Sequence, residues 1–175
     1  ILKAIHEMEK EHVKLMVFPE FCITGYTCHD LFLQRCLLDS AWDELLHIAE
    51  ETRETDALIF VGLPLRHRGK LYNVAAALNH GRIVGFVPKT HIPNYNEFYE
   101  QRQFAGAEEE DVEFVDFLKC EKNEEDEFWD EIPFGTELIF ECKEFPEFTV
   151  AAELCEDLWV PAPRSEERRV GKECL

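Results

Sequence analysis

The spacing of apolar residues along the chain predicts two helices. Leu2, Ile5 and Met8 recur at helical spacing with charged residues between them, so the sequence is expected to begin within a helix. A second helix is predicted over residues 40–55, because apolar residues again return every three or four positions and Ser40 can cap the first turn.

Short apolar runs predict the strands. They lie at residues 13–18, 57–63, 71–78, 82–87, 138–142 and 148–154. The third and fourth runs flank a turn that contains Gly81, which predicts a β-hairpin. Residues 21–34 and 88–104 are expected to be irregular or briefly helical. Strands that alternate with helices, together with one hairpin, predict a layered α/β domain.

The composition is that of a globular chain. Of its 175 residues, 46% are hydrophobic, which is enough for one sizeable core. No apolar run approaches the roughly 18 residues of a membrane span, and no signal-peptide layout is present. We therefore expect a cytoplasmic protein with no membrane partner. The seven cysteines show no CxxC spacing, which predicts reduced thiols and no metal site.

The formal net charge of −19 is unevenly distributed. An acidic balance of this size repels phosphate backbones, so we expect no nucleic-acid partner. Residues 108–131 contain thirteen acidic residues and two lysines, a net contribution of −11. This acidic segment is predicted to be a solvated loop or a mobile insertion.

Three reactive side chains follow predicted strands, where the backbone can hold them in place. Loss of hydration at Glu20 would raise its pKa and make it a better general base. Lys89 could stabilise a developing oxyanion. Backbone N–H groups after Cys155 would lower the pKa of its thiol, whereas neighbouring acidic residues would raise it. Each residue taken alone is equally compatible with an ordinary structural role.

Taken together, these residues and the segments around them resemble the nitrilase superfamily. The Glu-Lys-Cys triad of that superfamily stands here as Glu20, Lys89 and Cys155. Within it, three segments are similar to the glutaminase domains of bacterial glutamine-dependent NAD(+) synthetases: residues 17–32 (VFPEFCITGYTCHDLF), 62–104, and 153–161 (ELCEDLWVP). The resemblance implies a nitrilase-like αββα layered sandwich.

The resemblance also implies catalytic roles. Cys155 would attack the side-chain amide of L-glutamine. Glu20 would take the thiol proton, pass it to the departing ammonia and then activate water. Lys89 and the backbone N–H of Glu156 would hold the oxyanion of the tetrahedral intermediates. The products would be glutamate and ammonia, formed through a γ-glutamyl thioester.

Three further residues match binding positions of the family. Tyr95 matches a position that contacts glutamine, Glu100 matches a second, supporting glutamate, and Tyr26 would line the pocket. Packing of loops is the alternative explanation for Tyr95 and Glu100.

The resemblance covers residues 1–163 and implies part of a domain, truncated at both ends. Residues 164–175 are expected to be a tail foreign to that domain, and an ordinary charged tail is the alternative. The parent chain is expected to carry an ATP-dependent synthetase domain, which would use the ammonia to amidate nicotinate adenine dinucleotide. ATP and Mg²⁺ are expected only there, because this sequence has no Gly-rich phosphate loop and no expected cofactor.

Several expectations concern the assembly. The complete protein is expected to be a homo-oligomer, whereas the 175-residue chain alone is expected to be inactive and poorly stable because apolar faces stay uncovered. A stand-alone nitrilase-like amidase with another substrate, and a catalytically silent assembly module, are the two alternative functions.

Overall fold

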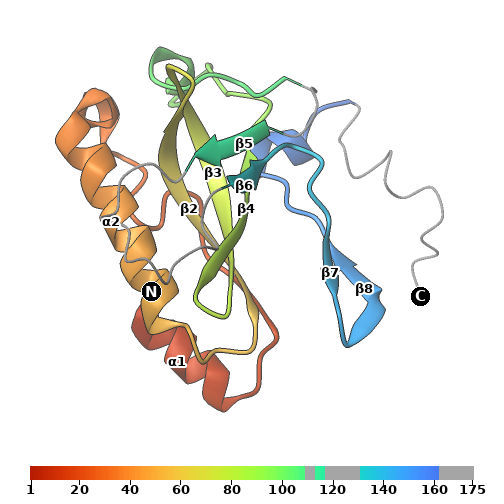
Figure 1. Cartoon of the computed structure of the whole chain (residues 1–175). Helices are drawn as coiled ribbons and strands as arrows, with labels where there is room; N and C mark the ends of the chain where they lie inside the picture. The colour runs from red at the N-terminus through yellow and green to blue at the C-terminus, as the bar shows by residue number, and fades with distance from the viewer. Residues whose placement is uncertain (109–112, 117–130, 162–175) are drawn as a thin grey trace.

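The computed structural model describes residues 1–108, 113–116 and 131–161 (Figure 1). The helices are α1 (Leu2–Lys10) and α2 (Arg35–Glu51), with short 3₁₀ helices η1 (His29–Leu33), η2 (Glu100–Arg102) and η3 (Cys155–Leu158). The strands are β1 (Leu15–Val17), β2 (Leu58–His67), β3 (Lys70–Asn79), β4 (Arg82–Pro88), β5 (Glu113–Asp116), β6 (Glu131–Phe134), β7 (Phe140–Cys142) and β8 (Phe145–Val150).

Six of these strands form one sheet in the order β1-β2-β3-β4-β6-β5, and β7 pairs with β8 in a second sheet. The predicted hairpin is confirmed as the antiparallel pair β3-β4. His80 and Gly81 at its turn have positive φ angles of 47° and 75°. Such angles at both central residues match the right-handed twist of the paired strands. The predicted α/β class is therefore confirmed.

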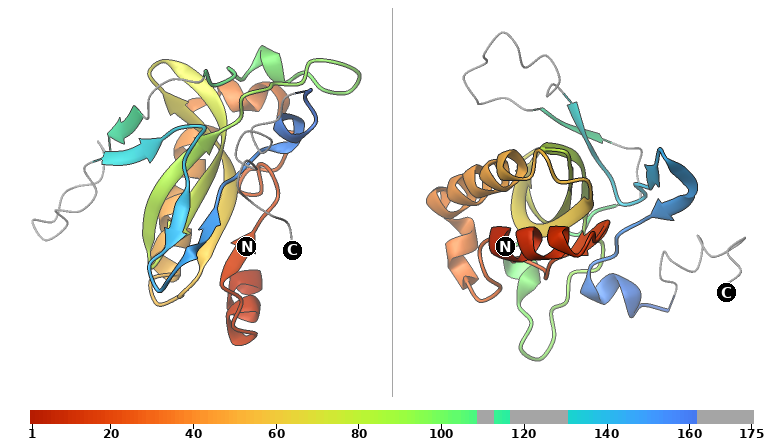
Figure 2. Two further views of the ribbon diagram at one scale, coloured as in Figure 1. Left: turned by 90° about the vertical axis from the view of Figure 1, so that its right-hand side faces the viewer. Right: turned by 90° about the horizontal axis from the view of Figure 1, so that it is seen from below.

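The helices cover one face of the large sheet. Ile5 of α1 and Leu45 and Ile48 of α2 belong to the same buried cluster as Ile59 and Val61 of β2. Figure 2 shows the two helices on one side of β2, β3 and β4, with β7 and β8 on the other side. On that other side, the ring of Phe140 packs edge-on against Phe60, with ring centroids 5.4 Å apart. The layers predicted from the sequence are thus present.

The second helix begins earlier than the sequence indicated. It starts at Arg35, with Gln34 in an extended conformation at the N-cap position, so Ser40 lies inside the helix and does not cap it. The physical reason is that Leu38 is buried together with Ala41, which continues the apolar face of the helix by one turn towards its N-terminus.

Two predicted strands have different bounds. The second strand continues beyond residue 63 to His67, because each of its last residues pairs with β3. The strand predicted at residues 148–154 is instead Phe145–Val150, and it is not buried, because it pairs with β7 rather than with the large sheet. The chain reaches Cys155 through an irregular segment, residues 151–154.

Part of the acidic segment is a strand rather than the predicted loop. Residues 113–116 form β5, which pairs antiparallel with β6. Val115 is buried, and Glu113 contacts both His67 and Arg68 at the end of the β2-β3 hairpin. These contacts give the strand an apolar side and two cationic partners. The other residues of the segment between 109 and 130, like the expected tail at 164–175, lie outside the described residues.

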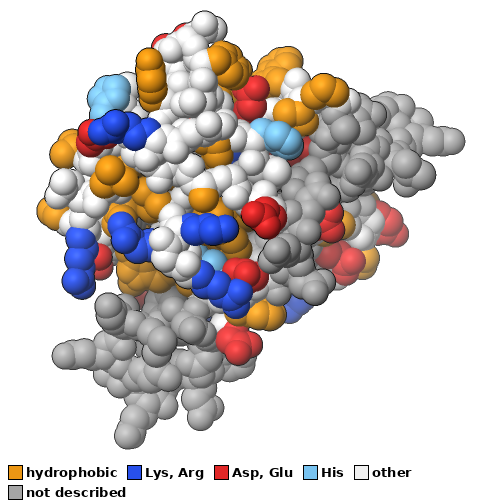
Figure 3. Space-filling model, turned by 90° about the horizontal axis from the view of Figure 1, so that it is seen from above, with side chains coloured by type: hydrophobic (Ala, Val, Ile, Leu, Met, Phe, Trp, Pro, Cys, Tyr) orange, Lys and Arg blue, Asp and Glu red, His pale blue; other side chains and the backbone are white. Residues whose placement is uncertain are grey.

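The described surface carries both signs of charge. The face seen in Figure 3 mixes basic, acidic and apolar side chains. Among the helices described, none is long and apolar enough to cross a membrane.

Candidate active site

Glu20 lies in a tight turn that follows β1. The turn is fixed against β2, because the backbone N–H of Ile23 donates to the carbonyl of Gly62 at 3.2 Å. The N–H of Cys22 also donates to the carbonyl of Pro19 at 3.0 Å. The Glu20 side chain is 18% exposed. Its carboxylate therefore faces the end of the sheet and keeps limited access to solvent.

Lys89 is the centre of a buried polar cluster. It follows β4, and its side chain is completely buried. Its ammonium lies 2.7 Å from Oε1 of Glu20 and 3.1 Å from Oε2 of Glu100. Burial lowers the pKa of Lys89, but the hydrogen bonds and charges of the two carboxylates outweigh burial and raise it above its ordinary value. The side chain therefore stays charged at neutral pH.

Asn73 and Tyr26 complete the cluster from two other elements. The Asn73 side chain, fully buried on β3, donates to Glu20 and, at 3.5 Å, to Glu100. The Tyr26 hydroxyl donates to Oε1 of Glu100. Glu100 itself is buried in η2. Two carboxylates thus share one ammonium and two neutral donors, which satisfies charges that burial would otherwise make costly.

Cys155 stands at the start of η3, after the extended residue Leu154. Its φ of +48° lies in the left-handed region, which is strained for a side chain with a Cβ atom. The residue is exposed. A sharp, strained turn of this kind is the usual way to present a nucleophile above the end of a sheet.

The Cys155 thiol is electrostatically coupled to the buried cluster. Burial of the sulfur raises its pKa, the Lys89 ammonium lowers it, and the carboxylates of Glu20, Glu100 and Glu156 raise it again. The pKa of the thiol therefore lies above its ordinary value. The sequence predicted opposing effects, and the structure shows that those raising the pKa prevail. The resting group is a thiol that needs a base to become a nucleophile.

Tyr95 and Glu156 form a pair beside the nucleophile. The Tyr95 hydroxyl donates to Oε2 of Glu156 at 2.8 Å. Tyr95 is 49% exposed. The structure thus groups Glu20, Lys89, Glu100 and Tyr26 in one cluster and places Tyr95 and Glu156 next to Cys155.

Sequence reasoning missed three residues of the site. Asn73 could have been found, since it is a polar residue within an otherwise apolar strand. Gly62 and Asp157 had no such local signal, because their contacts are with segments distant in sequence. No group of three or more side chains in the described ranges could hold a metal ion.

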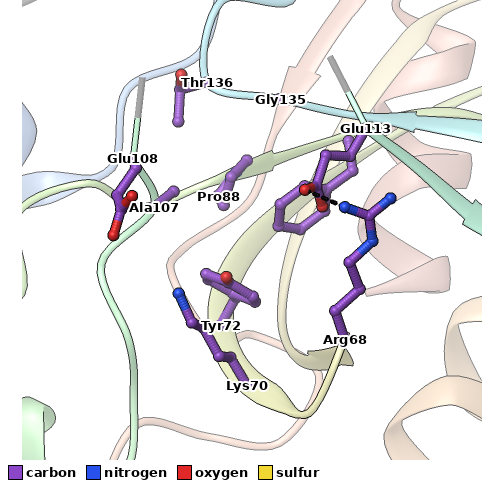
Figure 4. Close-up of a pocket in the computed structure, with 10 residues that line it drawn as sticks. Arg68, Lys70, Tyr72, Pro88, Ala107, Glu108, Glu113, Gly135 and Thr136 are labelled. Carbon is purple, nitrogen blue, oxygen red and sulfur yellow. Dashed lines mark hydrogen bonds and ion pairs between the residues drawn. The ribbon is translucent and has the colours of Figure 1, made fainter. Parts of the chain in front are cut away.

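A cavity of about 210 Å³ lies on the opposite face of the sheet (Figure 4). Tyr72 and Pro88 line it. They alternate along their strands with Asn73 and Lys89, whose side chains therefore point to the other face. An ion pair between Arg68 and Glu113 borders the cavity. The cavity is separate from the cluster around Lys89.

We expect Gly62→Ala to displace the turn that carries Glu20. An added Cβ would lie 2.5 Å from the Phe21 nitrogen, 2.9 Å from the Pro19 oxygen and 3.0 Å from the Glu20 Cα. These are backbone atoms, so the turn itself must shift. We predict a loss of about 1–3 kcal/mol in the free energy of unfolding and a kcat lower by about 10- to 100-fold.

Gly85→Ala is the matched control for this substitution. Its Cβ would meet the side chains of Leu138, at 2.9 Å, and Phe140, at 3.2 Å, which can move. Chemical denaturation and steady-state kinetics should show a stability cost without a comparable loss of kcat. A wild-type kcat in Gly62→Ala would contradict the predicted displacement.

The cluster also predicts a loss of stability at high pH. Burial raises the pKa of Tyr26, and the hydrogen bond to Glu100 raises it further. The pKa of Lys89 is raised as well. The unfolded chain therefore loses these protons at lower pH than the folded chain does. The stability from both groups is complete below about pH 10 and is lost as pH rises through the folded pKa values.

Thermal unfolding between about pH 8 and pH 11 would measure this loss. Tyr26→Phe should weaken the decline, because one of the two groups is removed. Tyr99→Phe is the matched control, since Tyr99 is an exposed tyrosine. An equal flattening of the profile in both variants would show that Tyr26 is not the group responsible.

Comparison with known proteins agrees with this geometry. The model of the carbon-nitrogen hydrolase family matches residues 1–164. The chain therefore belongs to the carbon-nitrogen hydrolase family. An amidase of the nitrilase superfamily from Nesterenkonia AN1 has a similar fold, with a TM-score of 0.51, 19% identity and coverage of 66% of this chain and 43% of the amidase.

More similar proteins are glutamine-dependent NAD(+) synthetases. The enzyme from Mycobacterium tuberculosis is 38% identical over 154 residues, which cover 87% of this chain and 21% of the enzyme. The crystal structure of the enzyme from Cytophaga hutchinsonii superposes with a TM-score of 0.75 at 29% identity, covering 89% of this chain and 24% of that one. The chain thus spans about a fifth of the length of the curated relatives it matches.

Proposed function

We propose that this chain is the glutaminase part of a glutamine-dependent NAD(+) synthetase. It would hydrolyse L-glutamine to glutamate and ammonia. The observation that carries the proposal is the buried Lys89 ammonium, which bridges Glu20 and Glu100 within electrostatic reach of the Cys155 thiol. The names of the relatives supply the substrate, since each is a synthetase that depends on glutamine.

Acylation begins with transfer of the thiol proton. Because the pKa of Cys155 is raised, little thiolate is present at neutral pH, and attack requires a base. Glu20 takes this role. The sulfur adds to the amide carbon of glutamine, and Glu20 passes the proton to the departing nitrogen. The carbon–nitrogen bond breaks, ammonia leaves, and a γ-glutamyl thioester remains on Cys155.

Lys89 stabilises the negative charge on the amide oxygen as this adduct forms. Its raised pKa keeps it protonated, and its buried hydrogen bonds hold it in one position before the substrate arrives. A charge fixed in advance in a poorly solvated site stabilises a transition state more than a mobile one does. The backbone N–H of Glu156 supplies the second donor to the oxyanion.

Deacylation uses the same groups in reverse. Glu20 accepts a proton from water, the resulting hydroxide attacks the thioester carbon, and the Cys155 sulfur leaves and recovers its proton. Glutamate is released. Asn73 and Tyr26 stay in contact with the two carboxylates throughout, which keeps Glu20 oriented.

The ammonia would serve a second domain of the same parent chain. That domain would use ATP and Mg²⁺ to activate nicotinate adenine dinucleotide, which the ammonia then converts to NAD(+). A cytoplasmic location and a homo-oligomeric assembly are parts of the same proposal, and both await measurement.

Glutamine turnover by the full-length protein tests the proposal. We expect equal amounts of glutamate and ammonia from L-glutamine and much slower release of ammonia from L-asparagine or simple aliphatic amides. Preference for another amide would favour a stand-alone amidase instead.

Labelling with a glutamine-like electrophile tests the silent-module alternative. The reagent should modify Cys155 much faster than the partly buried Cys22 and Cys142, because only Cys155 stands beside Glu20 and Lys89. Equal labelling of the three thiols would favour a module without catalytic function.

A further inference from the structure

Asp157 joins the nucleophile turn to the segment that follows Lys89. Its Oδ1 accepts hydrogen bonds from the backbone N–H groups of Thr90, at 3.1 Å, and His91, at 2.7 Å. Its Oδ2 also accepts from the Thr90 N–H at 3.2 Å, and the His91 Nδ1 lies 3.1 Å from Oδ1. Asp157 is only 3% exposed. One buried carboxylate thus contacts two consecutive residues, and the first of them is bonded directly to Lys89.

The position of this carboxylate matters because Cys155 is strained and exposed. Cys155 lies two residues before Asp157 in the same 3₁₀ turn, with its φ in the left-handed region. A strained residue keeps its conformation only when its surroundings hold it. A second contact holds the other partner, since the Lys89 N–H donates to the Asn73 carbonyl at 2.8 Å. The Asp157 contacts therefore connect the turn to a segment that is itself anchored to the sheet.

We propose that Asp157 is a positioning residue, whose carboxylate sets the placement of the Cys155 sulfur relative to the Lys89 ammonium. This inference rests on the proposed glutaminase function and extends it. Asp157 touches neither substrate nor reacting atoms. It acts through the backbone of Thr90 and His91, which are fixed relative to Lys89 because they follow it directly in the chain.

Asp157→Asn tests the proposal in the full-length protein. The amide keeps the shape of the side chain, but it replaces one acceptor oxygen by an NH₂ group that would face the N–H of Thr90. The turn should therefore move. We expect kcat for glutamine to fall by up to about 100-fold, as small displacements at reacting centres do, with a much smaller change in KM.

The rate of Cys155 alkylation by iodoacetamide as a function of pH supplies a second readout. The charged groups that act on this thiol are Lys89, Glu20, Glu100 and Glu156. If the sulfur moves away from the Lys89 ammonium, the thiolate loses that stabilisation, so the midpoint of the profile should move to higher pH. A residue that only stabilised the fold would lower the amount of active protein and leave the midpoint unchanged.

Asp39→Asn is the matched control. Asp39 pairs with Arg35 on the exposed side of α2, and its removal should leave both kcat and the alkylation midpoint at wild-type values. Circular dichroism would establish that the variants are folded. If Asp157→Asn does not fold, Asp157→Glu serves in its place. Glu keeps the charge but adds one methylene, which should also displace the turn and raise the midpoint.

The outcomes separate this inference from the proposed function. Wild-type turnover of glutamine with an unmoved midpoint in a folded Asp157 variant would overturn the positioning role and leave the glutaminase intact. A moved midpoint in a protein that does not hydrolyse glutamine would support the positioning role and overturn the proposed function.

Discussion

Replacing Cys155 by alanine should abolish glutamine-driven formation of NAD(+) in the full-length protein while synthesis from free ammonia persists. The thioester cannot form without the sulfur, so we expect the glutamine-dependent rate to fall by at least about 1,000-fold. The fold should be retained, because Cys155 is exposed. Parallel assays with glutamine and with an ammonium salt as nitrogen donor would measure the two activities.

Cys36→Ala provides the matched control, since Cys36 is an exposed cysteine on α2. It should leave both activities unchanged. Equal loss of the glutamine- and ammonia-driven rates in Cys155→Ala would contradict the assignment of Cys155 to a separate glutaminase site.

Glu20→Gln should have the second largest effect, and its two readouts should move in opposite directions. We expect kcat for glutamine to fall by about 10²- to 10⁴-fold, because the general base is lost. At the same time the Cys155 thiol should ionise more readily, since the Glu20 charge is one of the groups that raise its pKa. The alkylation profile of Cys155 should therefore move to lower pH.

The fold should tolerate Glu20→Gln better than loss of Lys89. Glu100 remains to pair with the buried ammonium, whereas Lys89→Met would leave two carboxylates without their cation. Glu50→Gln on the exposed face of α2 is the matched control. An alkylation profile that moved to higher pH in Glu20→Gln, or an unchanged kcat, would contradict the role of Glu20 as the base.

Local patterns in the sequence were sufficient for much of the fold. The β3-β4 hairpin was predictable because its turn and both strands are encoded within one short stretch. The bounds of α2 were not, because Ser40 has the chemistry of a cap while the burial of Leu38 decides where the helix begins. The strand β5 was hidden by acidic residues, since its stability comes from pairing with β6 and from partners for Glu113.

The site shows the same division between local and distant information. Glu20, Lys89 and Cys155 were found because each occurs in a recognisable segment. Their mutual arrangement depends on contacts that the sequence does not display. Asn73 reaches Glu20 across 53 positions, and Asp157 reaches Thr90 across 67 positions.

The central claim is that the Cys155 sulfur forms the covalent bond to glutamine. Rapid acid quenching of the full-length protein during turnover of radiolabelled glutamine, followed by peptide mapping, tests it most directly. Label should appear as a γ-glutamyl group on the peptide that contains Cys155, and it should be absent from Cys155→Ala. Turnover without label on that peptide, or label on another cysteine, would contradict the account.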